Sequence, residues 1–485
     1  MRKTILITLA ALCIANSYSK ENQTATQTIA PDKTAVFSSS DKLLEESYNW
    51  ARKTALSYSH DASDPVGYWY EAALPQREAF CMRDVSHQTV GAQIIGLTKH
   101  NKNMLTRFAE NISEAKDWCS YWEINRYNKP APADYTNDQT FWYNLNANFD
   151  VMQACVKMYD WTGDNDYIKD PCFTNFYTKS LNEYVKSWKL EPENIMNRPR
   201  FMNAPEDAKD NKDFSTSRGL ASYVENMGGL TASADLISTL YAGYIAHAEI
   251  ATINGDKAIA QKDKATALQY RQILEDKWWD ETNSYYQTLW TDDQKFHRGE
   301  GAPFILWFTV TENPKRIRAT VADILKQEWN VENISAFPAL FYRYGYDKEA
   351  YKFLTELPRM KRAEYPEVSF GVVEGVVGGA MGIQPSAQNK RIATLSHIEQ
   401  GFAAIENMPV FKGYVSVRHD GKKGSEFTNN TGEKIVWRAS FAGKQESMQI
   451  NGKKQKATVE TDILGNSFSY VDIELPNKET CKVKL

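Results

Sequence analysis

The segment Thr252–Ala260, TINGDKAIA, has the composition of a tight turn between two helices. Gly255 can adopt the left-handed conformation that ends one helix, and the carboxylate of Asp256 can cap the first turn of the next. Four further segments have a similar character: LTKHNKNMLTRF (97–108), YDWTGDNDYIKD (159–170), VTENP (310–314) and YRYGYDKEAYKF (342–353). These turns predict a chain of helical hairpins.

Long connections alternate with these short turns. They are rich in Pro, Gly, Asn and aromatic residues and cover 58–83, 116–137, 189–230, 277–302 and 358–370, with the shorter QEWNVEN at 327–333. Helices expected to begin near residues 41, 101, 165, 257, 314 and 347 lead into long loops. Those expected near 84, 138, 231, 303, 333 and 371 lead into short turns, except the last, which leaves the helical region.

The second helix of each pair is the more apolar, as in 230–251 and 370–383. Such helices are buried on most sides, whereas their partners carry Lys and Glu on an exposed face. Six buried and six outer helices that alternate along the chain predict an (α/α)6 toroid, a mainly α fold. All long loops then lie on one rim, at the N-terminal ends of the inner helices. The alternative is an open helical array without ring closure.

After Pro385 the pattern changes to short runs with β-branched and aromatic residues, separated by Gly, Asn and Lys turns. Lys434–Ala442 and Ser467–Leu475 are examples. We therefore expect a small antiparallel β-sandwich with a structural role. The predicted domains are a signal peptide at 1–19, a flexible linker at 20–40, the toroid at 41–385 and the β-sandwich at 386–485.

The N-terminus has the features of an export signal: Arg2 and Lys3, a short apolar run and a small-residue cleavage site. We expect a periplasmic or secreted protein, released rather than lipid-anchored at Cys13, because the bulky Leu12 precedes that cysteine. The other five cysteines are scattered, which predicts buried thiols rather than a disulfide framework or a zinc site. The net charge of −4 gives no reason to expect nucleic acid or an anionic membrane as partner.

The rim segment Gly67–Gln88, GYWYEAALPQREAFCMRDVSHQ, combines aromatic rings with carboxylates, arginines and a histidine. Rings that stack on a pyranose and carboxylates that move protons are what cleavage of a glycosidic bond requires. The stacking candidates are Tyr68, Trp69 and Trp142. The alternative is a loop whose aromatics fill the core while its charges pair with one another.

Glycoside hydrolysis needs two carboxyl groups, so ring closure matters. Glu78 lies where the first outer helix crosses to the first inner helix, and Glu364 and Glu367 lie at the corresponding crossing of the sixth pair. A closed ring makes these pairs neighbours. Asp84 is a further candidate, either as a positioning group or as the N-cap of the first inner helix. Glu374 is either a buried functional acid or an outward-facing residue.

Basic residues also fall on the rim, and the positive ends of the inner helices favour anions there. Arg77, Arg83, His87 and Arg298 would suit a substrate carboxylate, such as that of a uronic acid, and Glu225 adds a polar group. The alternative is that the arginines balance the protein's own acids. Histidines on the rim also keep lyase or epimerase chemistry open.

The chain resembles the bacterial six-hairpin glycosidases over roughly residues 41 to 480. PQRE at 75–78 is similar to a segment of α-L-rhamnosidases in which the glutamate is the general acid, which implies that role for Glu78. The residues that follow differ from that family's Trp-containing run and argue against rhamnose. EAFCMRDVSHQ at 78–88 and the Gly-rich last helix resemble exo-acting β-glucuronidases of Bacteroides-type glycan-degrading systems. In the rhamnosidases the base lies shortly before the last inner helix, which implies Glu367, with Glu364 second.

These observations predict an exported glycoside hydrolase that removes a terminal sugar from a glycan, with a uronic acid as the candidate sugar. Glu78 would donate the proton, Glu367 would activate water, and Asp84 and His87 would position Glu78. No metal or organic cofactor is implied. The rivals are a lyase that cleaves uronates, with His87 or a rim tyrosine as base, and a non-catalytic glycan-binding protein.

Overall fold

The computed structural model describes residues 35–74, 76–199, 218–224 and 229–485. The expected export signal, Cys13 and Glu225 lie outside the described residues. No helix in the described part of the chain is long and apolar enough to cross a membrane.

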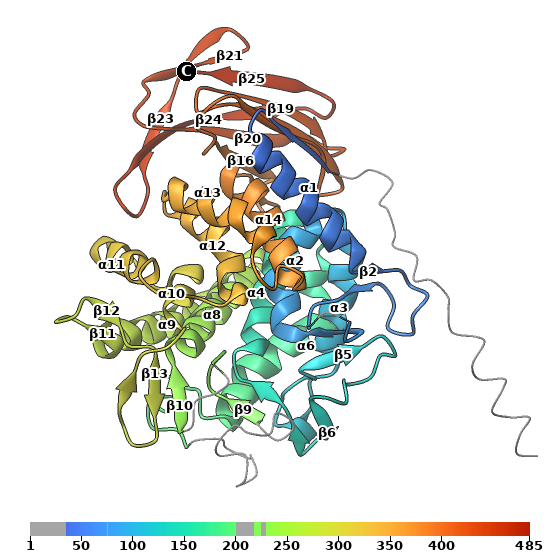
Figure 1. Cartoon of the computed structure of the whole chain (residues 1–485), viewed down its shortest axis with the longest axis vertical. Helices are drawn as coiled ribbons and strands as arrows, with labels where there is room; N and C mark the ends of the chain where they lie inside the picture. The colour runs from blue at the N-terminus through green and yellow to red at the C-terminus, as the bar shows by residue number, and fades with distance from the viewer. Residues whose placement is uncertain (1–34, 75, 200–217, 225–228) are drawn as a thin grey trace, which may run out of the picture.

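The helical region forms a closed ring of inner helices (Figure 1). The inner helices are α2 (Met82–Ile94), α4 (Ala147–Thr162), α8 (Ala234–Asn254), α10 (Ala302–Trp307), α12 (Val331–Arg343) and α14 (Pro366–Glu374). Each packs on the next, and α14 packs on α2. The outer helices are α1 (Lys42–Ser57), α3 (Thr98–Glu110), α6 (Pro171–Lys179), α9 (Lys257–Ile273), α11 (Pro314–Ile324) and α13 (Asp347–Glu356). The predicted (α/α)6 toroid is confirmed.

The turn between α8 and α9 illustrates how sequence specifies this alternation. Gly255 has φ +85°, and the Asp256 side chain accepts a hydrogen bond from the backbone N–H of Ile259 at 3.1 Å. Helix α8 buries residues on nearly all of its sides, whereas α9 buries a narrow stripe that includes Ala267 and Tyr270. Inner and outer helices thus differ in how much of their surface is apolar.

Glycines allow the first and last inner helices to meet. A Cβ atom on Gly91 of α2 would lie 2.3 Å from the carbonyl oxygen of Phe370 in α14. A Cβ atom on Gly371 of α14 would lie 2.4 Å from the carbonyl oxygen of Ser335 in α12. The backbones of α2, α14 and α12 therefore approach closely only because these positions carry no side chain.

Substitution Gly91→Ala is expected to destabilise the toroid by about 1–3 kcal/mol, because backbone atoms of α14 must move to admit the methyl group. The matched control is Gly378→Ala, where the nearest atom to a new Cβ is the flexible Glu374 Cγ at 3.7 Å. Urea unfolding followed by tryptophan fluorescence measures both. Equal unfolding midpoints for the two variants would show that the contact between α2 and α14 is not tight.

The rim loops contain short strands that the sequence pattern did not predict. Strand β4 (Ala79–Cys81) pairs with β5 (Glu123–Asn125), and β8 (Tyr143–Asn144) pairs with β9 (Arg218–Leu220). Strands β10 (Leu230–Ser233), β13 (Leu289–Thr291) and β14 (Phe296–His297) form a third small sheet. These ladders hold two to four residues each, too few for a period-2 pattern to stand out.

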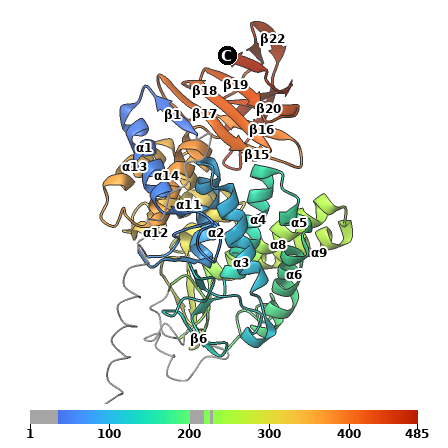
Figure 2. The ribbon, with the colours of Figure 1, turned by 90° about the vertical axis from the view of Figure 1, so that its right-hand side faces the viewer.

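The C-terminal region forms two sheets, seen above the toroid in Figure 1 and from the side in Figure 2. One has the order β1-β17-β18-β19-β25-β21-β22 and the other β15-β16-β20-β24-β23. The ring of Phe427 in β19 stacks on that of Trp437 in β20, with centroids 5.3 Å apart. The strand bounds are β15 (Gln384–Ser386), β16 (Arg391–Leu395), β17 (Phe402–Val410), β18 (Gly413–Asp420), β19 (Gly424–Asn430), β20 (Ile435–Ala442), β21 (Ser447–Ile450), β22 (Lys453–Lys456), β23 (Thr458–Thr461), β24 (Ser467–Leu475) and β25 (Thr480–Lys484).

One part of the predicted flexible linker is ordered. Val36–Ser39 forms strand β1 at the edge of the seven-stranded sheet, where Phe37 lies opposite Ile405 of β17. Phe37 is buried and its ring packs against Tyr48 of α1. The prediction was wrong here because the partner strand lies more than 360 residues away, so nothing local marks these residues as a strand. This strand ties the start of the toroid to the β-domain.

Candidate active site

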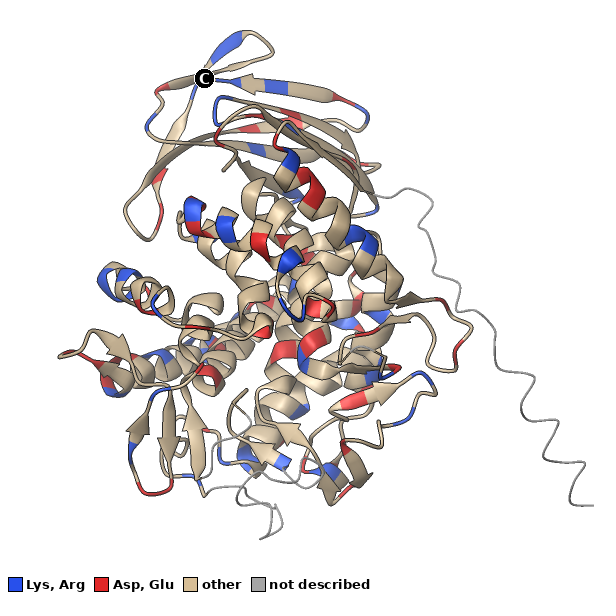
Figure 3. Cartoon of the chain, viewed as in Figure 1, with Lys and Arg blue, Asp and Glu red and all other residues tan. Residues whose placement is uncertain are grey.

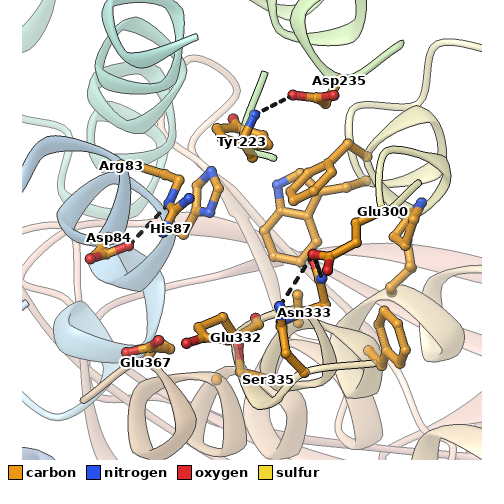
Figure 4. A pocket seen from close by; sticks show the side chains of 18 of the residues that line it. Arg83, Asp84, His87, Tyr223, Asp235, Glu300, Glu332, Asn333, Ser335 and Glu367 are labelled. Atoms are coloured by element: carbon orange, nitrogen blue, oxygen red, sulfur yellow. Dashed lines mark hydrogen bonds and ion pairs between the residues drawn. The ribbon is translucent and has the colours of Figure 1, made fainter. Parts of the chain in front are cut away.

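A cavity of about 360 Å³ opens at the rim where the N-termini of the inner helices converge. Residues from α2, α8, α10, α12 and α14 line it, together with Tyr223 and Val224 from a rim loop (Figure 4). Acidic and basic residues are mixed over the rest of the molecule in the view of Figure 3.

Each inner helix brings a carboxyl group to this end of the ring. Five stand in the first turn of a helix and one stands two residues before a helix: Asp84 (α2), Asp150 (α4), Asp235 (α8), Glu332 (α12), Glu367 (α14) and Glu300 (before α10). The partial positive charge of a helix N-terminus favours carboxylates at these positions. All of them except Asp150 line the cavity.

Asp84 and Glu367 are two carboxyl residues of the cavity whose charges influence each other. They come from the two inner helices that close the ring, and their side chains lie on the same side of the cavity in Figure 4. The Arg83 Nε donates to Asp84 Oδ1 at 3.2 Å. The Oε2 atom of Glu367 is buried and has no hydrogen-bond partner among the described residues. Burial, followed by the nearby charge of Asp84, raises the pKa of Glu367 to about 8.

This arrangement has a defined chemical capacity. A carboxyl group whose pKa is about 8 holds its proton at neutral pH and can donate it. The Asp84 carboxylate, which pairs with a guanidinium, supplies a negative charge beside that donor. A carboxyl group that keeps its proton, close to a second carboxyl group, is the kind of pair that glycoside hydrolysis uses.

Aromatic and basic residues surround this pair. The Arg83 guanidinium lies between the rings of Trp122 and Tyr223, at 5.9 and 5.5 Å from their centroids. The Tyr223 hydroxyl donates to both carboxylate oxygens of Asp150, at 2.7 and 2.8 Å, and His87 Nε2 lies 3.4 Å from Asp150 Oδ1. Asp150, which does not itself line the cavity, therefore orients the side chains of Tyr223 and His87, which do.

The opposite wall of the cavity is built by α10 and α12. Glu300 accepts hydrogen bonds from the side-chain amides of Asn330 at 3.2 Å and Asn333 at 2.8 Å. Phe304 and Trp307 add aromatic surface. A carboxylate fixed by two amides beside aromatic rings is suited to sugar hydroxyls and an apolar sugar face.

The structure does not bring Glu78 or Glu364 into the cavity. The Glu78 side chain is 53% exposed, and Arg126 Nη1 donates to its Oε1 at 2.6 Å. Glu78 has φ +53° in the irregular turn before β4, so its side chain points toward the loop after β5. Glu364 is also exposed and does not line the cavity. The expected pairing of Glu78 with Glu367 is therefore corrected, and Asp84 lies beside Glu367 instead.

Asp84 is not the N-cap of its helix, because Cys81 occupies that position and Asp84 stands in the first turn. Of the predicted substrate-binding residues, Arg83 and His87 line the cavity. The stacking role of Trp69 and Trp142 does not hold, because they are 0% and 1% exposed. Both rings belong to the core, as the alternative interpretation of the rim loops expected.

The remaining predicted binding residues lie outside the cavity and have other partners. The Tyr68 ring meets His100 edge-on, with centroids 5.4 Å apart. The Arg77 guanidinium pairs with Glu123 and with Asp134, the latter at 3.0 Å. The Arg298 guanidinium pairs with Asp323 at 2.5 Å. These arginines balance the protein's own acids.

The sequence interpretation did not single out Asp150, Asp235 or Glu332. The signal that identifies them is positional, since each stands in the first turn of an inner helix. For Asp150 that pattern was concealed, because the start of its helix was predicted near 138 whereas α4 begins at Ala147. The described residues contain no group of His, Cys, Asp and Glu side chains arranged to hold a metal ion.

Comparisons with known proteins show similarity in three-dimensional structure but none in sequence. No protein-family model matches the chain, and no curated protein matches it. Solved structures that match include an α-L-rhamnosidase from Dictyoglumus thermophilum, with TM-score 0.61 and 13% identity over 93% of this chain and 50% of that one. A rhamnosidase from Bacillus sp. GL1 matches with TM-score 0.56 and 10% identity, over 82% and 41%.

An α-L-rhamnosidase from Aspergillus terreus matches with TM-score 0.54 and 12% identity, over 92% of this chain and 50% of that one. The chain spans about half the length of the rhamnosidases it matches. The similarity covers the helical ring and the β-domain together. The chain has the fold of the six-hairpin glycosidases, an (α/α)6 toroid with a C-terminal β-domain.

Proposed function

We propose that the protein is a glycoside hydrolase that removes a terminal sugar, a uronic acid, from a glycan. The observation that carries the proposal is the carboxyl pair of Asp84 and Glu367, in which a Glu367 oxygen has no hydrogen-bond partner among the described residues. The fold is shared with rhamnosidases, which adds support for cleavage of a glycosidic bond.

In the proposed reaction Glu367 donates its proton to the glycosidic oxygen as the bond from that oxygen to the anomeric carbon breaks. The leaving group departs as an alcohol. Asp84 then acts either as the base that takes a proton from attacking water or as the nucleophile. Carboxyl separations of roughly 6.5–9.5 Å correspond to the first case and of about 5 Å to the second.

The size of the cavity supports action at a chain end. Its volume of about 360 Å³ lies near the lower end of the range for small-molecule sites. A space of that size holds one or two sugar rings rather than a section of polysaccharide.

A second candidate is a lyase that cleaves uronates by β-elimination. His87 lines the cavity, and its Nε2 atom lies 3.4 Å from Asp150 Oδ1. A carboxylate in this position commonly orients a histidine that acts as a catalytic base. Tyr223 also lines the cavity and is fixed by the same carboxylate.

We also propose export to the periplasm or the medium, which the basic and apolar residues of 2–15 support. Cell fractionation of the full-length chain tests this point. Recovery of the protein with its first residues intact in the cytoplasm would contradict it.

The test of function is a panel of aryl glycosides that includes a β-glucuronide, a β-glucoside and an α-L-rhamnoside, with product analysis. Hydrolysis releases the free sugar, whereas elimination yields an unsaturated product that absorbs in the near ultraviolet. Glu78→Gln serves as a control and is expected to keep activity within about threefold of the wild type, because surface substitutions have small effects. Binding of glycans without any cleavage would overturn the hydrolase proposal in favour of a binding protein.

A further inference from the structure

Helix α14 brings a second acid to the cavity besides Glu367. Glu374 is the last residue of the helix, and both residues line the cavity. The distance between them in sequence is close to two helical turns, so the two side chains leave the same face of α14. Their Cα atoms lie about 10 Å apart along the axis, at 1.5 Å per residue. Because α14 runs inward from the rim, Glu374 lies deeper than Glu367.

The Glu374 carboxyl group has no hydrogen-bond donor from the protein. Among the described residues, no group forms a hydrogen bond or an ion pair with it. Lys157, and then Arg343 and His87, attract its charge from beyond ion-pair contact. Burial has the larger effect and raises the pKa of Glu374. A carboxyl group in such surroundings is costly without hydrogen bonds, and a ligand in the cavity can supply them.

Two further polar groups of the cavity lining have no partner. Gln88 stands one turn after Asp84 in α2 and is 2% exposed, and neither polar atom of its side-chain amide forms a hydrogen bond among the described residues. Trp307 ends α10, and its indole N–H has no acceptor among the same residues. The ring centroids of Trp307 and His87 lie 6.0 Å apart, so α10 and α2 bring these groups to the same part of the ring.

The three groups match the hydrogen-bonding properties of sugar hydroxyls, which both donate and accept. Glu374 offers an acceptor, the Trp307 N–H offers a donor, and the Gln88 amide offers one of each. An apolar ligand would leave all three unsatisfied, which is unfavourable for buried polar groups. The inner end of the cavity is therefore suited to a ligand that carries hydroxyl groups.

We propose that the inner end of the cavity is a hydroxyl-recognition subsite, in which Glu374, with Gln88 and Trp307, determines specificity for a free 4-hydroxyl group on the terminal sugar. The inference rests on the proposed function and names the part of the sugar that the cavity recognises. In a pyranose ring C-4 lies opposite the anomeric carbon. With the glycosidic oxygen at Glu367, the 4-hydroxyl group points inward, toward Glu374.

The spacing of the two acids along α14 fits one sugar ring. A hydrogen bond of about 2.8 Å at each end of the roughly 10 Å between them leaves space for a single ring. In an internal unit of a 1,4-linked polysaccharide the 4-oxygen carries the next sugar, for which this space has no room. The subsite therefore accounts for removal of the terminal unit, in which the 4-hydroxyl group is free.

The experiment compares an aryl β-glucuronide with its 4-deoxy analogue, or the same pair for whichever sugar of the panel the wild type cleaves fastest. The wild type is expected to prefer the 4-hydroxyl substrate about 10–100-fold in kcat/KM, the contribution of a hydrogen bond to a charged group. Glu374→Met, which keeps the length and loses the polar group, is expected to abolish this preference and to leave the 4-deoxy substrate within about threefold. Glu374→Gln, which can still bond the hydroxyl group, is expected to keep part of the preference.

The control is Glu356→Met, which alters an exposed glutamate at the end of the outer helix α13 and is expected to keep the full preference. Wild-type protein that cleaves no glycoside would remove the proposed function itself. Wild-type protein that cleaves both substrates equally well would leave a hydrolase and overturn the hydroxyl subsite. An equal loss on both substrates in Glu374→Met would show that Glu374 serves only as a counter-charge for Lys157, and would also overturn it.

Gln88→Leu covers the case in which Glu374→Met does not fold. The Gln88 amide has no partner among the described residues, so an apolar side chain of similar size is expected to leave the unfolding temperature unchanged or raised. Its kcat/KM is nevertheless expected to fall about tenfold on the 4-hydroxyl substrate and to stay within about threefold on the 4-deoxy analogue. Wild-type kinetics of Gln88→Leu on both substrates, or an equal loss on both, would contradict the proposal.

Discussion

Glu367→Gln is expected to lower kcat by about 10²–10⁴-fold on glycosides with poor leaving groups, such as alkyl glycosides. The amide keeps the size of the side chain and removes the proton that assists departure of the leaving oxygen. On a dinitrophenyl glycoside, whose leaving group departs without a proton, the loss is expected to be less than about tenfold. The contrast between the two substrates, measured under single-turnover conditions, reports the role of a proton donor.

The pH profile provides an independent check. A proton donor must be protonated to act, and the pKa of Glu367 is about 8. Wild-type activity is therefore expected to fall as the pH rises through about 8, and this alkaline limb is expected to disappear in Glu367→Gln on the dinitrophenyl substrate. Equal losses on both leaving groups would show that Glu367 is not the donor, and would return it to the role of water-activating base predicted from the sequence.

The same substitution is expected to affect stability in a defined direction. Folding raises the pKa of Glu367 from 4.5 to about 8. The free energy of unfolding therefore falls as the pH rises from about 4.5 through 8, because the unfolded side chain ionises before the folded one. Glu367→Gln removes that dependence and is expected to unfold at a higher temperature than the wild type at pH 9, by a few degrees. A variant that is inactive yet more stable at pH 9 has not lost activity through misfolding.

Asp84→Asn is expected to lower activity by about 10³-fold or more on every substrate, because the negative charge that acts on water or on the anomeric carbon is removed regardless of the leaving group. Added azide, a small anionic nucleophile, is expected to restore part of the activity on the dinitrophenyl glycoside and to yield a glycosyl azide. The matched control is Glu364→Gln, which alters an exposed carboxylate outside the cavity and is expected to leave kcat within about threefold.

Asp84→Asn has a second expected consequence that a purely structural role would not produce. The charge of Asp84 contributes to the raised pKa of Glu367, so its removal is expected to lower that pKa. The alkaline limb of the residual activity is then expected to move to lower pH. An unchanged alkaline limb, or full activity of Asp84→Asn on alkyl glycosides, would contradict the proposed pair.

The pairing of helices was predicted correctly from the sequence because the signals that specify it, turn residues and apolar patterns, are local. A glycine such as Gly255 and a capping acid such as Asp256 act within one turn of chain, and the apolar character of an inner helix appears in its own residues. Counting these turns predicted the closed toroid. Ring closure in turn predicts that Glu367 lies close to the first inner helix.

Side-chain direction in the rim loops was not predictable in the same way. Glu78 and Asp84 are six residues apart and both carry a carboxyl group, but Glu78 lies in an irregular turn with positive φ, whereas Asp84 lies in the first turn of α2. The Arg126 that holds Glu78 outward comes from a separate rim loop. Trp69 is a comparable case, since whether its ring meets a sugar or the core depends on His60 and Asp64.

By itself, the sequence determined the hairpin order, the closed ring, the β-domain and a short set of acids that included both Asp84 and Glu367. Only the tertiary structure decided which of those acids face one cavity and that Val36–Ser39 completes a sheet. The physical reason is the distance along the chain over which each interaction acts. Helix periodicity and capping are set by neighbours along the chain, whereas the direction and pKa of a rim side chain are set by groups that only folding brings together.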